Sequence, residues 1–332
     1  GSKRLNTIKQ EKLNNQAANL DVETSENSIQ ESIAQIYIQI LYAAESVKVN
    51  ENTLQVSIAQ RDRGQELLNA GSIAKSDLAQ LEAQVSTDRY QLVTAQATLE
   101  DYKLQLKQLL ELDGENEMNI YLPALSDENV LAPLPTKRDV YISALSLRPE
   151  IEASKLNVEA SELGINIAKS SYFPTISLSA GIGTNHTSGS DFTFGEQVKN
   201  GWNNSIGLSV SVPIFNNRQT KSAVQKAKLQ YETSMLSLLD EQKTLYKTIE
   251  GLWLDANSAQ QRYAAANEKL KSTQISYELI SEQFNLGMKN TIELLTEKNN
   301  LLQAQQEQLQ AKYMAILNTQ LLKFYQGDQL AL

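Results

Sequence analysis

Side chains able to carry out chemistry are scarce in this sequence of 332 residues. It contains no cysteine and a single histidine, His186, which lies in a polar stretch and is expected to be solvated. Glu293 and Glu297 have the spacing of neighbours on one helix face, where a solvated acidic pair is commoner than a catalytic one. With no nucleophile beside a base, no cluster of metal ligands and no phosphate loop, the sequence predicts no enzyme, no cofactor and no metal site.

Composition also bears on partners and location. The net charge is −9 and no basic stripe is present to neutralise phosphates, so nucleic acid is not expected as a partner. No run of about 18 apolar residues predicts a transmembrane helix. The absence of cysteine is compatible with an oxidising compartment. Gly1 and Ser2 look like a cloning remnant, so we expect that a leader was removed.

An internal repeat organises the chain around two glycine-containing turns. Residues 65–71 read QELLNAG and residues 281–287 read SEQFNLG, so their glycines are 216 positions apart. The same offset pairs Asp77 with Glu293, an acid near the start of the helix that follows each turn. Glycine at such a reversal allows the positive φ that ends one helix before the next begins. The sequence therefore predicts a duplication of helical hairpins.

Both halves of the repeat have the period of long amphipathic helices. All six prolines lie between positions 123 and 213, so no helix breaker interrupts 1–122 or 214–332. A helix from Lys3 to Asn69 would be roughly 100 Å long at about 1.5 Å per residue. Apolar residues three or four positions apart form the expected coiled-coil seams, with Asp88 as the polar exception after the first turn. The seams are Ile29, Ile33, Ile36, Ile40, Ala43 and Val47; Leu78, Leu81, Val85, Asp88, Leu92, Ala95, Leu99, Tyr102, Leu106 and Leu109; and Leu245, Ile249, Leu252, Ala256, Ala259 and Tyr263. Helix pairing within the chain is expected to bury Ile33, Ile36, Leu92 and Leu99.

Two stretches in the middle of the chain alternate with a period of two. Residues 175–182 and 205–212 place apolar side chains on one face and small polar groups on the other, as strands do. The apolar face comprises Ile176, Leu178, Ala180, Ile182, Ile206, Leu208, Val210 and Val212. The polar face includes Ser177, Ser179, Ser209 and Ser211. We expect an antiparallel hairpin joined by a polar loop over 184–201.

This alternation fits either a soluble hairpin packed on a core or a membrane hairpin with its apolar face toward lipid and its polar face toward water. Each stretch has nearly the length of about 9–11 residues that a tilted strand needs to cross a bilayer. A hairpin attached to helices of roughly 100 Å has no soluble core to cover, which favours the membrane. Trp202, Tyr172 and Phe173 flank the strands, either as ordinary strand-end aromatics or as anchors at the membrane boundary.

The segment that leads into the first strand resembles a family motif. Residues 144–151 read ALSLRPEI and are followed by Ala153, Ala160, Ala168 and YFPTISL over 172–178. This resembles the "Leu-x-x-Arg-Pro-Glu-Ile … Ala … Pro-x-Leu-x-Leu" entry into an outer-membrane strand in the TolC-type outer-membrane efflux proteins. SVPIF over 211–215 is similar to that family's exit from a strand into a long helix. With the two glycine turns, the resemblance covers essentially the whole chain.

The resemblance implies a mainly α fold in which very long antiparallel coiled-coil hairpins, in an internal duplication, carry one transmembrane β-hairpin. It implies a homotrimer with a β-barrel in the outer membrane, surrounded by lipid, and an α-barrel in the periplasm. The protein would be a passive exit duct of a tripartite efflux or type I secretion system. Its partners would be a periplasmic adaptor and an inner-membrane pump. The adaptor would dock on turns formed by Asn69, Ala70, Gly71, Ser72, Asn285, Leu286, Gly287 and Met288.

The chain departs from the family pattern at its start. Residue 1 aligns with Asn217 in the repeat, so a counterpart of 137–216, with the second strand pair, is missing. We therefore expect an N-terminally truncated piece that forms no native trimeric pore by itself. The expected divisions are a first-repeat periplasmic hairpin over 1–112, a connector over 113–136, a helix leading to the membrane over 137–171, an outer-membrane β-hairpin over 172–215 and a second-repeat periplasmic hairpin over 216–332.

Two functions other than an exit duct also fit part of the sequence. A periplasmic adaptor also uses long helical hairpins, but it flanks one hairpin with lipoyl-like and β-barrel domains that this sequence does not suggest. A secreted coiled-coil structural protein would need no strands with one apolar and one polar face. Both remain alternatives at the level of the sequence.

Overall fold

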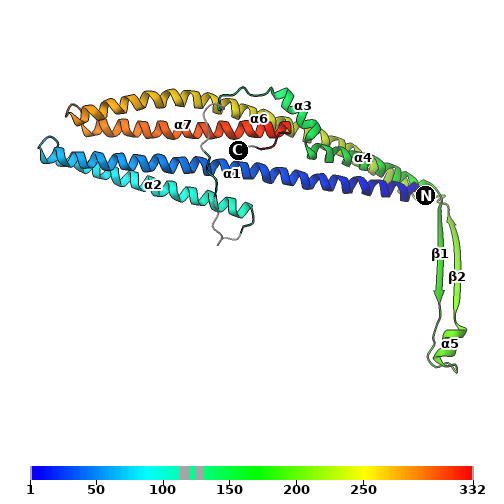
Figure 1. Cartoon of the computed structure of the whole chain (residues 1–332). Coiled ribbons are helices and arrows are strands. Elements are labelled where there is room, and N and C mark those ends of the chain that lie inside the picture. The colour runs from blue at the N-terminus through cyan, green and yellow to red at the C-terminus, as the bar shows by residue number, and fades with distance from the viewer. Residues whose placement is uncertain (1, 113–119, 124–129, 331–332) are drawn as a thin grey trace. The chain divides into compact units, whose positions relative to one another are not determined.

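The computed structural model describes residues 2–112, 120–123 and 130–330. Its elements, in chain order, are α1 (Ser2–Asn69), α2 (Lys75–Leu109), α3 (Lys137–Leu147), α4 (Pro149–Lys169), β1 (Thr175–Gly183), α5 (Phe194–Asn200), β2 (Asn203–Ser211), α6 (Gln219–Asn285) and α7 (Thr291–Gln326) (Figure 1). The fold is mainly helical with a two-stranded sheet, as predicted. Parts of the predicted connector over 113–136, at 113–119 and 124–129, lie outside the described residues.

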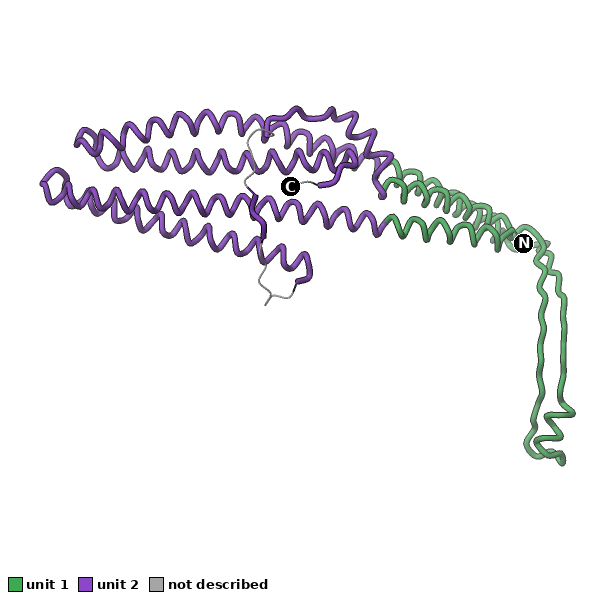
Figure 2. Tube along the Cα trace, viewed as in Figure 1, with its two compact units in different colours: residues 1–20, 150–241 green, residues 21–149, 242–332 purple. Residues whose placement is uncertain are grey.

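The chain divides into two compact units (Figure 2). Unit 1 consists of residues 1–20 and 150–241, and contains α4, both strands and α5. Unit 2 consists of residues 21–149 and 242–332, and contains both helix reversals, α2, α3 and α7. The long helices α1 and α6 run from one unit into the other.

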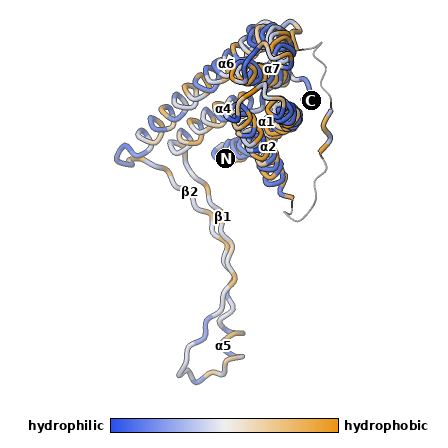
Figure 3. The backbone as a smooth tube through the Cα atoms, turned by 90° about the vertical axis from the view of Figure 1, so that its left-hand side faces the viewer, coloured by the Kyte–Doolittle hydropathy of each residue, from blue (hydrophilic) through white to orange (hydrophobic). Residues whose placement is uncertain are grey.

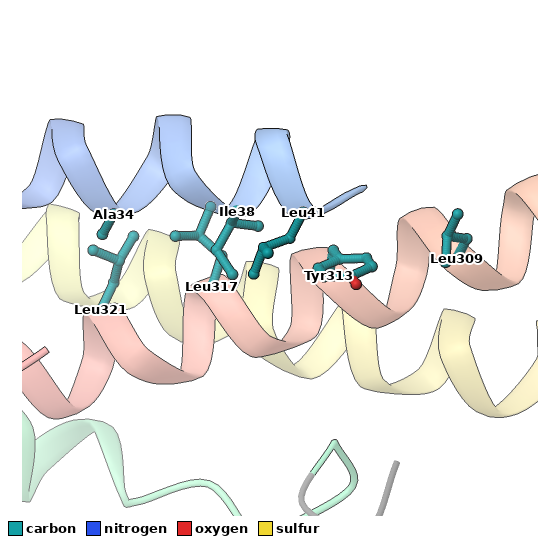
Figure 4. Packing of buried hydrophobic residues seen from close by; sticks show 7 residues of the cluster. All are labelled: Ala34, Ile38, Leu41, Leu309, Tyr313, Leu317 and Leu321. Atoms are coloured by element: carbon teal, nitrogen blue, oxygen red, sulfur yellow. The ribbon is translucent and has the colours of Figure 1, made fainter. Parts of the chain in front are cut away.

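Unit 2 is held together by apolar contacts between helices that are far apart in the sequence. One cluster joins α1 to α7 through Ala34, Ile38, Leu41, Leu309, Tyr313, Leu317 and Leu321 (Figure 4). The members recur at steps of four and three on α1 and at steps of four on α7, so each helix presents one continuous stripe to the other. A second cluster packs Ala259 and Tyr263 of α6 against Ala311 and Ala315 of α7. The second hairpin is therefore closed on itself and also bound to α1.

The predicted seam is displaced in α1, whereas the seam predicted for α2 is buried at Leu78, Leu81, Val85, Asp88 and Leu106. Ile40 and Ala43 are buried as predicted, but Ile29 is 47% exposed. The residues whose burial was expected are only half-buried: Ile33, Ile36, Leu92 and Leu99. The prediction of burial is wrong for these four residues, and in α1 the adjacent stripe, with Ile38, faces α7 instead. A period of 3.6 residues permits either stripe, and the position of the partner helix decides between them. The second-hairpin seam is largely confirmed, with Leu245, Ile249, Ala256, Ala259 and Tyr263 buried.

The helix predicted over 137–171 is broken in two. Arg148 has extended dihedrals (φ −76°, ψ 125°), so α3 ends at Leu147 and α4 begins at Pro149. The residue before a proline is pushed out of the helical region by a clash with the proline ring, which is the physical reason for the break. Arg148 itself is buried and its guanidinium lies 3.3 Å from the Glu31 carboxylate and 4.3 Å from the ring centre of Tyr325. The break thus directs one arginine into the core of unit 2.

The helices of unit 1 approach one another through small side chains. Ala153 and Ala160 of α4 are buried, and Ser161 Oγ lies 2.8 Å from Ser234 Oγ of α6. Gln10 of α1 donates to the Ala160 carbonyl at 2.7 Å. Beyond α4, the strands β1 and β2 form an antiparallel hairpin, with hydrophobic residues along both strands (Figure 3). The loop expected over 184–201 contains the short helix α5, at whose start the Glu196 carboxylate accepts from the Thr193 N–H at 2.9 Å.

Candidate functional site

The chain reverses after α1 through a turn centred on Gly71. The Gly71 N–H donates to the Leu68 carbonyl (2.9 Å) and the Ser72 N–H donates to the Leu67 carbonyl (2.8 Å). This pair of bonds is the Schellman pattern that satisfies the last carbonyls of a helix. Gly71 has a φ of +73°, in the left-handed region that strains any residue with a Cβ. The predicted need for glycine at this reversal is confirmed.

The reversal after α6 repeats this geometry. The Gly287 N–H donates to the Phe284 carbonyl (2.9 Å), and the Met288 N–H donates to the Gln283 carbonyl (2.8 Å). Gly287 also has a φ of +73°. The two turns are therefore the same structural motif, placed at equivalent positions of the duplicated hairpins.

An acidic residue caps the helix that follows each turn. In α2 the Asp77 carboxylate accepts from the Ala74 N–H at 3.0 Å. In α7 the Glu293 carboxylate accepts from the Asn290 N–H at 3.1 Å and lies 2.6 Å from Lys289 Nζ. The bond from Lys289, and then that from the Asn290 N–H, lower the pKa of Glu293 below its ordinary 4.5, because both favour the charged form. This cap is complete above pH 4.5 and is lost as the pH falls through the lowered pKa.

The two turns lie side by side within unit 2 (Figure 1). Directly behind them, Leu81 of α2 packs with Phe284 of α6 and Leu294 of α7, and Leu67 of α1 contacts the same cluster. Because these side chains come from all four helices of the two hairpins, the cluster fixes the turns relative to each other. The duplication thus produces one composite surface instead of two separate loops.

The outer side of this composite surface is exposed. All residues over 69–72 and 285–288 are solvent-accessible, which includes every residue predicted for docking. The first turn is polar, whereas the second presents Leu286 and Met288, each 70% exposed. Among described residues, none lies within 4 Å of the position that a Cβ on Gly71 or Gly287 would occupy. The backbone of both turns is therefore open to a partner.

The register of β1 and β2 sorts their side chains as the alternation predicts. The strands pair antiparallel from Thr175 opposite Ser211 to Gly183 opposite Asn203. The apolar cross-strand pairs on one face are Ile176 with Val210, Leu178 with Leu208, and Ala180 with Ile206. The small polar pairs on the other face are Ser177 with Ser209, Ser179 with Gly207, and Gly181 with Ser205. Of the predicted apolar set, Ile182 lies opposite Asn204 and Val212 lies one residue beyond β2.

Both faces of the hairpin are exposed among the described residues. Leu178 is 75% exposed and Ile206 is 84% exposed, values that an aqueous surface does not favour for large aliphatic side chains in a row. The polar face is closely packed at Gly207, where a Cβ would lie 2.9 Å from Ser179 Oγ. The hairpin therefore has one face suited to an apolar environment and one smooth, polar face.

A buried ion pair links the two hairpins behind the turns, and the sequence pattern indicates only one of its two residues. Asp88, the polar member of the predicted seam, accepts from Lys298 of α7 and from Ser57 of α1. Gln84 donates to the other carboxylate oxygen at 2.9 Å. The side chains of Lys298 and Asp88 are only 4% and 2% exposed, and burial lowers the pKa of Lys298. Asp88 stands out in the sequence because it is the polar residue in an otherwise apolar seam, but nothing in the sequence near Asp88 indicates Lys298 as its partner.

The described residues offer no chemistry that would suggest catalysis. His186 is exposed, with Nδ1 3.1 Å from Gln197 Oε1 and its ring edge-on to Phe194. Glu297 accepts from Ser276 Oγ at 2.9 Å. No group of three potential metal ligands occurs among the described residues. None of the helices described here combines the length and the apolar character required to cross a membrane.

The family model described as "Outer membrane efflux protein" matches residues 140–327, more than half of the chain. The chain belongs to the outer membrane efflux protein family. Membership in this family, whose model is described as an outer membrane efflux protein, assigns the protein to the outer membrane.

Curated relatives have low sequence identity to this chain, but the matches cover most of it. The outer membrane efflux protein BepC of Brucella suis biovar 1 (strain 1330) is 24% identical over 294 residues, which cover 88% of this chain and 61% of the relative. The outer membrane protein TolC of Escherichia coli (strain K12) is 23% identical over 305 residues, which cover 89% and 60%. The chain therefore spans about three fifths of the length of these relatives.

Solved structures of similar proteins confirm the fold. The structure of CusC has a TM-score of 0.85 at 19% identity, and the match covers 98% of this chain and 74% of that chain. VceC from Vibrio cholerae has a TM-score of 0.81 at 17% identity, with 99% and 77% covered. In this outer membrane efflux protein, the residues that carry the family resemblance serve the fold: Arg148 enters the core of unit 2, and Ala144 and Ile151 are fully buried.

Proposed function

We propose that this chain is part of a trimeric exit duct that conducts substrates passively through the outer membrane and the periplasm. The β1–β2 hairpin carries the proposal, because its register gathers large apolar side chains on one face and serines and glycines on the other. Lipid on the apolar face and water on the polar face would satisfy both. The polar face would then line the duct with small groups that leave room for a substrate.

The open edges of the hairpin support an assembly. Within the described residues, β1 and β2 pair only with each other, so each strand has one edge with unpaired N–H and C=O groups. In hydrocarbon every such group needs a partner, which is why membrane-spanning sheets close on themselves. Strands from further copies, and from the part of the protein beyond this chain, would close the sheet.

The duct would depend on other proteins for energy and selection. Solved relatives are described as outer-membrane channels, among them OprN and Campylobacter jejuni CmeC. By analogy, an inner-membrane pump would supply the energy and a periplasmic adaptor would connect the pump to this duct. Family membership argues against the two alternatives, a periplasmic adaptor and a structural coiled coil.

Fractionation and conductance of the full-length protein test the duct. We expect the protein in the outer-membrane fraction as a trimer, and we expect discrete conductance steps when purified trimer is added to planar lipid bilayers. The polar face lines the path, so Ser177→Arg and Ser209→Arg should lower cation conductance with normal trimer yield. Recovery of the full-length protein in the inner membrane or soluble periplasm, or trimers without conductance, would refute the proposed duct.

We further propose that the composite surface over 69–72 and 285–288 docks the adaptor. Support comes from its exposure, from the rigid cluster that joins the turns, and from the apolar side chains of Leu286 and Met288. A protein partner can cover exposed apolar side chains on a pre-organised backbone at a reduced entropic cost of ordering. The two turns together would form one docking surface per protomer.

Substitution at the two glycines tests this docking surface. Gly71→Val with Gly287→Val should abolish adaptor crosslinking and export, since a β-branched residue at a φ of +73° forces both turns to change conformation. The matched control is Gly71→Asn with Gly287→Asn, because asparagine tolerates left-handed dihedrals. We expect the control to retain most of the crosslinking. Normal crosslinking and export in the valine variant, at normal trimer levels, would exclude the turns as the docking surface.

A further inference from the structure

The charge of unit 1 is strongly asymmetric next to the β-hairpin. Three segments at or next to the strands, 1–10, 163–175 and 203–231 (the last of which includes β2), contain no aspartate or glutamate. They contain eight cations: Lys3, Arg4, Lys9, Lys169, Arg218, Lys221, Lys226 and Lys228. In a chain with a net charge of −9, this local excess of positive charge creates a region of positive potential that attracts anions.

Five of these cations lie nearest the hairpin, and we name them the basic collar: Lys3, Arg4, Lys169, Arg218 and Lys221. They come from the first turn of α1, the last turn of α4, and the residues that open α6, three segments at the base of β1 and β2 (Figure 1). All five side chains are exposed. The collar therefore forms where the helices give way to the strands.

A pocket at the base of the hairpin combines this charge with apolar groups. It has a volume of about 760 Å³, and its lining combines Lys3 and Arg4 with apolar groups, Phe173, Pro174, Ile176 and Pro213 among them, and with six serine and threonine residues. The apolar lining is continuous with the apolar face of the hairpin through Ile176. A ligand that fits such a pocket has an anionic head and an apolar tail.

The collar lacks internal counter-charges. Within the described part of the chain, none of its five cations forms an ion pair with a carboxylate. The first turn of α6 contains no acidic residue, and Arg218 and Lys221 add positive charge at the positive end of the helix dipole. An external anion at this place would relieve the repulsion among the cations and offset the dipole.

We propose that the basic collar binds the phosphate groups of anionic phospholipids in the bilayer leaflet that meets the base of the β1–β2 hairpin. The inference rests on the proposed function, in which the apolar face of the hairpin contacts lipid. Arginine can hold a phosphate through two parallel hydrogen bonds, and lysine supplies a point charge. The acyl chains would lie along Ile176 and the apolar face, while the head group would lie in the pocket with Lys3 and Arg4.

Calorimetric titration of the detergent-solubilised full-length protein tests the collar. We expect short-chain phosphatidylglycerol to bind, and phosphatidylcholine of the same chain length to bind far more weakly. The variant Arg4→Gln, Arg218→Gln, Lys221→Gln should weaken phosphatidylglycerol binding about 100-fold, since each cation near an anionic lipid contributes roughly a factor of five. Circular dichroism and trimer yield should be unchanged, because the three side chains are exposed.

A matched control removes the same charge elsewhere. Lys48, Lys103 and Lys155 each form an exposed ion pair with a glutamate three residues earlier, and their replacement by glutamine should leave phosphatidylglycerol binding unchanged. Equal binding of the two lipids, unchanged binding in the collar variant, or competition by inorganic phosphate at equal concentration would overturn the lipid assignment. Bilayer conductance of the unmodified protein is measured separately, so its loss would refute the duct and leave a positive titration of the collar intact.

Discussion

Replacing Lys298 with methionine is expected to lower the free energy of unfolding by about 3–5 kcal/mol, the cost of leaving a buried charge without its partner. The change would leave the Asp88 carboxylate, 2% exposed, with Ser57 and Gln84 as its described donors. A hydroxyl and an amide do not compensate a full negative charge in the interior. Because Lys298 connects α7 with α1 and α2, the two hairpins should also separate more readily behind the turns.

Denaturant unfolding followed by far-UV circular dichroism measures this effect. The double variant Lys298→Met, Asp88→Leu should recover most of the loss, because apolar side chains can replace a buried ion pair at little cost. Lys289→Met is the control: it removes the lysine of a partly exposed pair with Glu293 and should cost less than about 1 kcal/mol. If Lys298→Met unfolds like the control, or the double variant recovers nothing, the buried pair does not join the hairpins.

Leu178→Arg in the full-length protein should impair assembly in the outer membrane. A cation on the lipid face near the middle of the bilayer costs about 2–4 kcal/mol per strand, and a trimer carries the substitution three times. Leu178 lies opposite Leu208 near the centre of the hairpin, so an arginine side chain at this position cannot easily extend to the membrane boundary. We expect a strong decrease in the fraction of protein recovered as outer-membrane trimer.

The neighbouring residue provides the control for this experiment. Ser177 lies one position earlier, on the opposite face and opposite Ser209. Ser177→Arg should therefore assemble at near-normal yield, since its charge would face water. Quantifying trimer in isolated outer membranes distinguishes the two variants, and equal tolerance of arginine at both positions would argue against lipid on the apolar face.

Local patterns in the sequence determine much of this protein. The period-two alternation over 175–182 and 205–212 predicts which side chains share a face, because successive residues of a strand point to opposite sides whatever surrounds it. The glycines at 71 and 287 mark the reversals, because a positive φ is a property of a single residue. The break at Arg148 was missed, although the following proline is itself a local signal.

Only the tertiary structure decides how distant segments meet. The stripe that α1 buries depends on where α7 lies, so Ile38 is buried while Ile29 is exposed. Lys298 is 210 residues from Asp88, and no spacing rule connects them. Periodicity predicts which residues of one helix or strand share a face. The rotation of one helix against another, and the pairing of charges between helices, depend on contacts among residues far apart in the chain.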